Sequence, residues 1–145
     1  MSKSNAWETA LLNLVFNNTD AANIGDATGL QGSSIAGSLY VSLHTSDPGE
    51  AGSPSTNECA YTSYARVGVA RSGAGWTISG NAVTNAALIQ FPQCTGGSET
   101  ATHFGIGTAS SGGTLLYKGA LSASLAISSG IQPQFGAGDL DGTED

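Results

Sequence analysis

Charged residues are scarce in this chain of 145 residues: they make up 10% of it, against roughly a quarter of an ordinary soluble domain. Positive charge is the scarcest, with 4 Lys and Arg against 11 Asp and Glu and a formal net charge of −7. Nucleic acids and anionic membranes both bind through clustered cations, so this balance argues against either as a direct partner. A weakly charged surface built from glycine, hydroxyls and amides favours a protein that packs against neighbours.

Long hydrophobic runs are also missing. No window approaches the roughly 18 apolar residues of a membrane-spanning helix. The N-terminus, MSKSNAWETALL, lacks the basic-then-apolar order of a secretory signal. We therefore expect a soluble protein made in the cytoplasm.

Cysteine is limited to Cys59 and Cys94. Two thiols cannot complete a four-cysteine zinc site. The simpler interpretation is two independent small apolar residues. A disulfide between adjacent loops is the alternative; it would close a loop of about 35 residues and contribute roughly 3–4 kcal/mol.

Catalytic patterns are absent from the sequence. His44 and His103 are the only histidines, and we interpret each as a strand residue with its ring at a sheet surface, although nearby carboxylates also allow a metal or general-base role for His44. No serine sits in a Gly-x-Ser-x-Gly elbow, and the glycines of residues 105–113 lack the Lys-Ser/Thr of a phosphate loop. We expect no enzymatic activity, no cofactor and no metal.

What the sequence does contain begins with one helical pattern over residues 5–17. Asn5 and Glu8 suggest a capping box, and Asn17-Asn18 ends the pattern. The helix is interpreted either as covering one end of a β-domain or as lying against a partner subunit. The predicted apolar stripe consists of Trp7, Ala10, Leu11, Leu14 and Val15.

Residues 20–38 are polar and dotted with glycine, which predicts a loop that is long for a connection inside a compact domain. Its isolated anchors are Ile24, Leu30 and Ile35. Loops of this length are often interaction segments.

About eight strands are expected after this loop. The clearest local signal is a hairpin of residues 102–108 and 114–121 around a Ser/Gly turn. With one helix and turns at intervals of roughly 8–15 residues, the pattern predicts an all-β chain, an antiparallel jelly-roll-like β-sandwich forming a single domain over residues 1–145. The acidic tail 139–145 is expected to be solvated and partly disordered, and the alternative is a last edge strand at Asp139-Leu140. The remaining strands are predicted at 39–44, 61–71, 76–78, 82–91, 122–128 and 131–135.

Arg66 and Arg71 are the only arginines, and both fall on one predicted strand and its end. They suit charge-assisted contacts to an acidic neighbour, with a simple solvated surface as the alternative. Together with the helix and the 20–38 loop they complete the candidate partner contacts: Trp7, Leu11, Leu14, Ile24, Leu30, Ile35, Arg66 and Arg71.

A family resemblance runs over about residues 6–140. It rests on WETALLNLVF, LYVSLHTSDPGEAG, NECAYTSYARVGVARS, THFGIGTASSGGTLLYKGAL and SGIQPQFGAGDL, of which DPGEAG, YARV and FGI…GGTLLYKGAL are the most specific. The series resembles small all-β structural proteins of tailed bacteriophages, some of them jelly-roll capsid cement or decoration proteins and others tail-fibre-like. The 20–38 insertion and the two cysteines depart from the usual pattern.

The resemblance implies a virion component that is not an enzyme. The expected function is a cement protein made in the host cytoplasm, bound as a homo-oligomer to the major capsid protein lattice at the capsid surface. It would stabilise the lattice mechanically, through many individually weak contacts. The alternative is a tail-fibre or receptor-binding β-module.

Overall fold

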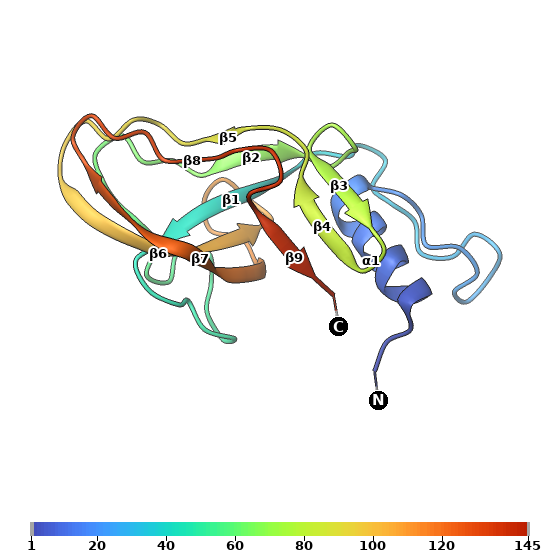
Figure 1. Cartoon of the computed structure of the whole chain (residues 1–145). Helices are drawn as coiled ribbons and strands as arrows, with labels where there is room; N and C mark the ends of the chain where they lie inside the picture. The colour runs from blue at the N-terminus through green and yellow to red at the C-terminus, as the bar shows by residue number, and fades with distance from the viewer. Residues whose placement is uncertain (1, 145) are drawn as a thin grey trace. The chain divides into compact units, whose positions relative to one another are not determined.

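A computed structural model describes residues 2–144 of the chain, and these contain one helix and nine strands joined by turns and loops (Figure 1). The expected all-β class is confirmed, with antiparallel sheets and a single N-terminal helix, and the sheets are consistent with a sandwich. The helix, of 13 residues, is too short to span a membrane, and no other helix occurs in residues 2–144. The elements are α1 (Asn5–Asn17), β1 (Ser38–His44), β2 (Val67–Ala70), β3 (Trp76–Ser79), β4 (Ala82–Asn85), β5 (Ile89–Gln90), β6 (Ser98–Gly107), β7 (Leu115–Ser128), β8 (Gln134–Phe135) and β9 (Asp141–Thr143).

The chain divides into two compact units. The first unit comprises residues 1–37, 70–88 and 135–145, and the second comprises 38–69 and 89–134. Each unit is therefore built from segments that are distant in sequence. The single domain expected over residues 1–145 stays a prediction.

In the first unit, helix α1 packs on the antiparallel sheet β3-β4-β9. Its buried apolar side chains are Leu12 and Phe16, and the Phe16 ring meets Trp76 edge-on with centroids 4.9 Å apart. The predicted stripe through Trp7, Leu11 and Leu14 is wrong as the core face, because these side chains are only half-buried. The helix carries apolar residues on two adjacent faces. The buried face, with Leu12 and Phe16, lies one residue further along the chain than the predicted face, and the contact between Phe16 and Trp76 explains why it is the buried one.

The helix ends are formed by residues just outside it. The N-cap is Ser4, whose Oγ accepts the Trp7 N–H at 3.4 Å, so the Asn5–Glu8 capping box is wrong. Asn18 adopts the left-handed conformation with φ 54°, and its N–H donates to Asn13 O. This confirms the predicted stop.

The C-terminal segment is ordered through residue 144, which corrects the expected disordered tail. Leu140 is 2% exposed, and strand β9 pairs with β4, Gly142 lying opposite Val83. The Glu144 carboxylate then lies 3.4 Å from the Lys3 ammonium. Asp145 lies outside the described residues.

The second unit contains the four-stranded sheet β2-β1-β6-β7. The predicted hairpin is confirmed as β6 and β7 and is longer than expected, because the separate strand predicted at 122–128 continues β7. A bulge bends the pair where Ala101 faces Leu125 and His103 faces Ala120. A second sheet consists of β5 and β8.

Three predicted strands are shorter than expected. Of residues 131–135 only β8 is extended. Of residues 61–71 only β2 is extended, because Tyr64 N–H donates to Tyr61 O in a turn that places Ser63 at φ 84°. The strand predicted at 82–91 divides into β4 and β5. The buried Asn85 amide ends β4 by donating to Ala87 O at 2.8 Å and to Gly136 O at 2.7 Å.

Strand β1 is covered on both faces. Leu39, Val41 and Leu43 are buried as predicted, but Ser42 and His44 on the opposite face are 0% exposed. The prediction of a half-buried strand is therefore wrong. Ser42, His44 and the polar groups packed over this second face form a buried polar layer.

Candidate functional site

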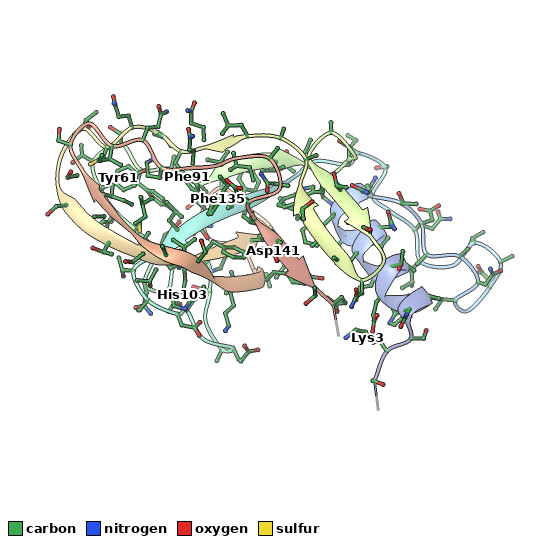
Figure 2. All side chains as sticks on the ribbon, in the orientation of Figure 1. Lys3, Tyr61, Phe91, His103, Phe135 and Asp141 are labelled. Carbon is green, nitrogen blue, oxygen red and sulfur yellow. The ribbon has the colours of Figure 1, made fainter. Side chains whose placement is uncertain are left out.

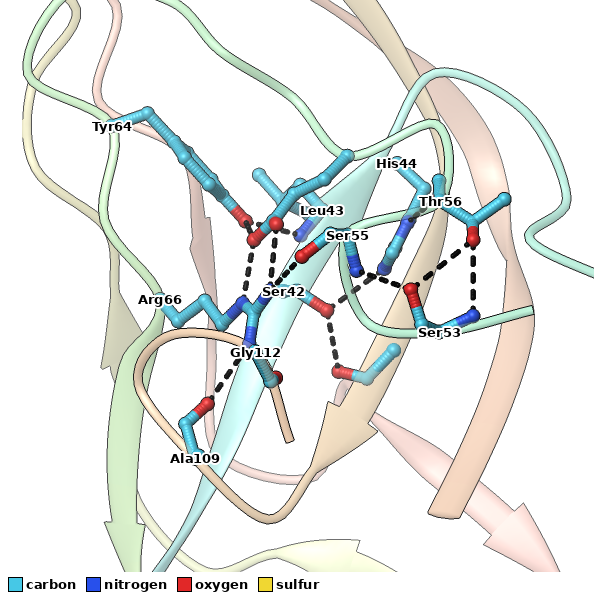
Figure 3. Close-up of polar contacts among 12 residues, drawn as sticks. Ser42, Leu43, His44, Ser53, Ser55, Thr56, Tyr64, Arg66, Ala109 and Gly112 are labelled. Carbon is cyan, nitrogen blue, oxygen red and sulfur yellow. Dashed lines mark hydrogen bonds and ion pairs between the residues drawn. The ribbon is translucent and has the colours of Figure 1, made fainter. Parts of the chain in front are cut away.

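Arg66 is the centre of this polar layer (Figure 3). A guanidinium has five N–H donors, and each of the five finds an acceptor. Nε and Nη2 donate to the two carboxylate oxygens of Glu58 at 2.7 and 2.8 Å, and Nη2 also donates to Ser55 Oγ at 3.0 Å. Nη1 donates to Ala109 O at 3.0 Å and to Gly112 O at 2.8 Å. Arg66 thus fastens the 45–57 loop and the β6–β7 turn to the segment before β2.

Glu58 and Tyr64 complete the network. The Tyr64 hydroxyl donates to Glu58 Oε1 at 3.0 Å and accepts the Leu43 N–H at 3.0 Å. The Arg66 side chain is 4% exposed and that of Glu58 16%. Burial raises the pKa of Tyr64, and the hydrogen bonds that Arg66 donates to Glu58 raise the pKa of Arg66. A charge pair so withdrawn from water is acceptable because every donor is satisfied.

An aromatic cluster lies beside this network. The Tyr64 ring meets Tyr61 edge-on at 5.2 Å and stacks on Phe91 at 6.2 Å between centroids. Tyr61 and Phe91 are labelled in Figure 2, and the Tyr61 hydroxyl donates to Pro92 O at 2.8 Å. Burial raises the pKa of Tyr61 to about 12. These rings belong to the core of the second unit.

Ser42 and His44 form a hydrogen-bonded pair, Oγ to Nε2 at 2.8 Å. The other ring nitrogen, Nδ1, lies 2.8 Å from the Thr56 carbonyl oxygen, which can only accept, so Nδ1 carries the proton and Nε2 accepts from Ser42. Burial lowers the pKa of His44 and keeps the ring neutral. The expected position of this ring at a sheet surface is wrong; His103, on β6, is half-buried.

Gly105 makes room for this pair. It lies opposite Ser42 in the β1–β6 register. A Cβ at this position would stand 2.7 Å from His44 Nε2, 2.8 Å from Ser42 Oγ and 2.9 Å from Leu115 Cδ1. Glycine is therefore required here by close packing.

Arg71 performs a similar task in the first unit. Its Nε and Nη2 donate to Val15 O and Leu14 O, each at 2.7 Å, and Nη1 donates to Ser33 Oγ at 3.2 Å and Ala36 O at 3.1 Å. The last turn of α1 has no cation of its own. Arg71 supplies one, satisfying carbonyls at the negative end of the helix dipole.

The two lysines also pair within the chain. Lys118 Nζ lies 3.2 Å from Asp47 Oδ1 and 3.1 Å from Glu50 Oε1, and Lys3 pairs with Glu144. These hydrogen bonds raise the pKa of Lys118. Across residues 2–144, no group of three or more His, Cys, Asp or Glu is arranged to hold a metal ion.

Both cysteines are buried free thiols, which confirms the simpler interpretation over the disulfide. Burial, followed by the nearby Glu99 carboxylate, raises the pKa of Cys59 to about 12. Cys94 Sγ lies 3.3 Å from Gly96 O. The raised pKa of Cys59 disfavours its thiolate, the form that reacts as a nucleophile.

The predicted partner contacts fall into three groups. Both arginines direct their donors inward, and the three helix residues are half-buried. The loop residues Ile24, Leu30 and Ile35 are exposed by 39%, 43% and 83%, so they do not anchor the loop in the core, and their role as partner contacts stays a prediction. Sequence reasoning missed Ser42, Glu58 and Tyr64; the available signal was an isolated arginine in an alternating apolar segment, eight residues after a glutamate.

The pieces of sequence that carry the family resemblance meet in the Arg66 network. Arg66 lies in YARV, and Gly112 lies in the β6–β7 turn. Leu43, whose N–H donates to the Tyr64 hydroxyl, lies in LYVSLHTSDPGEAG. No curated protein matches the chain. Over residues 2–143 it matches the family described as Podophage GP4 fiber I protein gp80. The chain belongs to this family and is a structural protein of a bacteriophage virion.

Proposed function

We propose that the protein is a non-enzymatic, fibre-type component of a podophage virion, which acts through passive protein–protein contacts. One observation carries this proposal: all four cationic side chains pair with acceptors inside the chain. The chemistry left at the surface is neutral, acidic and aliphatic. The family's description as a fiber protein supports the fibre over other parts of the particle.

The Ser42–His44 pair supports a structural role rather than catalysis. A nucleophilic serine needs substrate access and a histidine oriented by a carboxylate. Both side chains are 0% exposed, and Nδ1 of His44 faces a backbone carbonyl. We expect a Ser42→Ala variant to enter virions and support infection as the wild type does; normal incorporation with lost infectivity would refute the structural role.

A capsid cement protein is the second candidate. The low charge and the ordered, aliphatic 20–38 region favour permanent packing into a lattice. In this case the partner is the major capsid protein, the site is the capsid surface, and the protein acts as a homo-oligomer.

Copy number and position in the virion separate the two. Quantitative mass spectrometry of purified particles gives the ratio to the major capsid protein, and gold-labelled antibodies give the position. A low ratio with label at the tail supports the fibre. A ratio near that of the capsid protein with label over the head supports cement. Absence from washed virions would overturn both.

A further inference from the structure

The loop between α1 and β1, residues 18–37, is held in one conformation by hydrogen bonds. Ala21 and Leu30 exchange two backbone hydrogen bonds of 2.8 and 2.9 Å, and Asn18 holds Ser33 through two more of 2.8 and 2.7 Å. The loop is also fastened at its end by the Arg71 contacts to Ser33 and Ala36. Its conformation is therefore fixed before any partner arrives, which lowers the entropy lost on binding.

This ordered loop buries very little of its own apolar surface. Ala21 is its one buried residue, whereas Ile24, Leu30 and Ile35 are exposed. Three of the six large exposed aliphatic residues among residues 2–144 lie on this loop. Fixing aliphatic side chains in water gains nothing for folding, and exposed aliphatic residues gathered on one segment are typical of contact surfaces.

The charge of the loop points to the partner's chemistry. Asp20 and Asp26 are exposed, and the sequence has no Lys or Arg between Lys3 and Arg66. Each carboxylate accepts a backbone N–H, Asp20 from Gly32 at 2.7 Å and Asp26 from Thr28 at 2.8 Å. The hydrogen bonds from Thr28 and Gly29 lower the pKa of Asp26.

The first unit as a whole is acidic. It contains two cations against seven carboxylates, a net −5, while the second unit has two against four, a net −2. A second copy of this chain would bring a first unit of the same sign to the loop. Charge complementarity therefore favours a cationic partner over self-association through this surface.

We infer that the 18–37 loop docks on another virion protein, at an apolar depression bordered by Lys or Arg side chains. This inference rests on the proposed function and names its contact surface. Ile35, the most exposed aliphatic residue, enters the depression with Ile24 and Leu30, and Asp20 and Asp26 face the cations.

Competitive incorporation tests the apolar contact. An epitope-tagged second copy, expressed in infected host cells, competes with the untagged protein for places in the virion. We expect the Ile24→Ser/Leu30→Ser/Ile35→Ser variant to fall at least tenfold in the tagged-to-untagged ratio, because burying one such side chain is worth roughly a factor of ten in affinity. The matched control is Leu116→Ser/Ile131→Ser, two side chains each 40% exposed in the second unit, and it should incorporate normally.

The outcomes keep the inference separate from the proposed function. A tagged wild-type copy that never enters virions overturns the proposed function. A wild-type copy that enters together with the triple variant overturns only the docking loop. Because Ile35 is 83% exposed, Ile35→Ser alone should keep the wild-type unfolding midpoint, and several-fold poorer incorporation of this folded variant is expected. Normal incorporation would count against the loop.

Two further measurements identify the partner's chemistry. Asp20→Asn/Asp26→Asn keeps the oxygen acceptors and removes the charges, so release from virions by NaCl should begin at lower salt and depend less steeply on it. Asp47→Asn/Glu50→Gln is the control in the second unit. A photo-crosslinking residue at position 35 should attach to a different virion protein at a peptide containing Lys or Arg. Attachment to a second copy of this chain, or unchanged salt release of the Asp20/Asp26 variant, would overturn the inference.

Discussion

Replacing Arg66 tests whether its five hydrogen bonds stabilise the second unit. Arg66→Met removes the charge and all five donors while leaving a side chain of similar length. Glu58, whose side chain is 16% exposed, then loses the cation with which it pairs, and the carbonyls of Ala109 and Gly112 lose the donors of Arg66. The β6–β7 turn is no longer tied to the segment before β2.

The magnitude follows from burial and from the number of bonds. Breaking a buried ion pair by removing one partner costs about 3–5 kcal/mol, and the residual exposure of Glu58 places this case near 3. Arg66→Lys keeps the charge, but one ammonium cannot reach both Glu58 and the turn, so two or three bonds of about 1 kcal/mol each are lost. Adding Glu58→Gln to Arg66→Met removes the unpaired charge. The double variant should therefore lose less free energy of unfolding than the two single variants lose together.

Urea unfolding followed by far-ultraviolet circular dichroism measures these free energies. Both tryptophans, Trp7 and Trp76, lie in the first unit, so their fluorescence reports that unit separately. Ser55→Ala is the matched control, because it removes one acceptor of the same guanidinium and should cost about 1 kcal/mol or less. Arg66→Met within about 1 kcal/mol of the wild type would refute the reasoning.

Three other properties follow from the geometry. Gly105→Ala should destabilise by about 1–3 kcal/mol in urea unfolding through the clash with His44 and Ser42, while Gly73→Ala, whose Cβ would meet open space, should be neutral. The pKa of His44 is lowered in the folded chain, so below the ordinary value of 6.5 the unfolded chain binds a proton that the folded chain does not. The free energy of unfolding therefore keeps its full value above pH 6.5 and falls as the pH drops below it. A His44→Gln variant should lose this part of the pH dependence. Cys59 and Cys94 should resist a thiol reagent in buffer and react fully in urea; fast labelling of the native protein would contradict their burial.

Local patterns predicted those parts of the fold that depend on neighbouring residues. The helix over 5–17, its stop at Asn18 and the glycine-turned hairpin follow from periodicity and turn chemistry alone. The tail was mispredicted because acidic composition suggests solvation, whereas Leu140 and the β4–β9 pairing are tertiary contacts. The break between β4 and β5 likewise depends on what the Asn85 amide reaches across the fold.

The polar network around Arg66 could not be predicted from local sequence patterns. Alternation placed Ser42 and His44 on the outer face of a strand, and nothing local indicates that this face is covered. The sequence predicts that Arg66 contacts an acidic neighbour, and in the structure Arg66 pairs with Glu58 of the same chain. The loop predicted at 20–38 follows from its length and polar, glycine-dotted composition, but whether its aliphatic residues face the core or the solvent is decided by the tertiary fold.

The ion pair between Lys3 and Glu144 joins the two ends of the described chain, and both belong to the first unit. In an engineered chain that begins at Lys3 and ends at Glu144, a short linker of a few residues would close the backbone into a ring without displacing α1 or β9. New ends opened at an exposed turn, such as Gly73 between β2 and β3, would give a circular permutant with the same tertiary contacts in a different order. For this protein the order of the elements along the chain is thus separable from their arrangement in space.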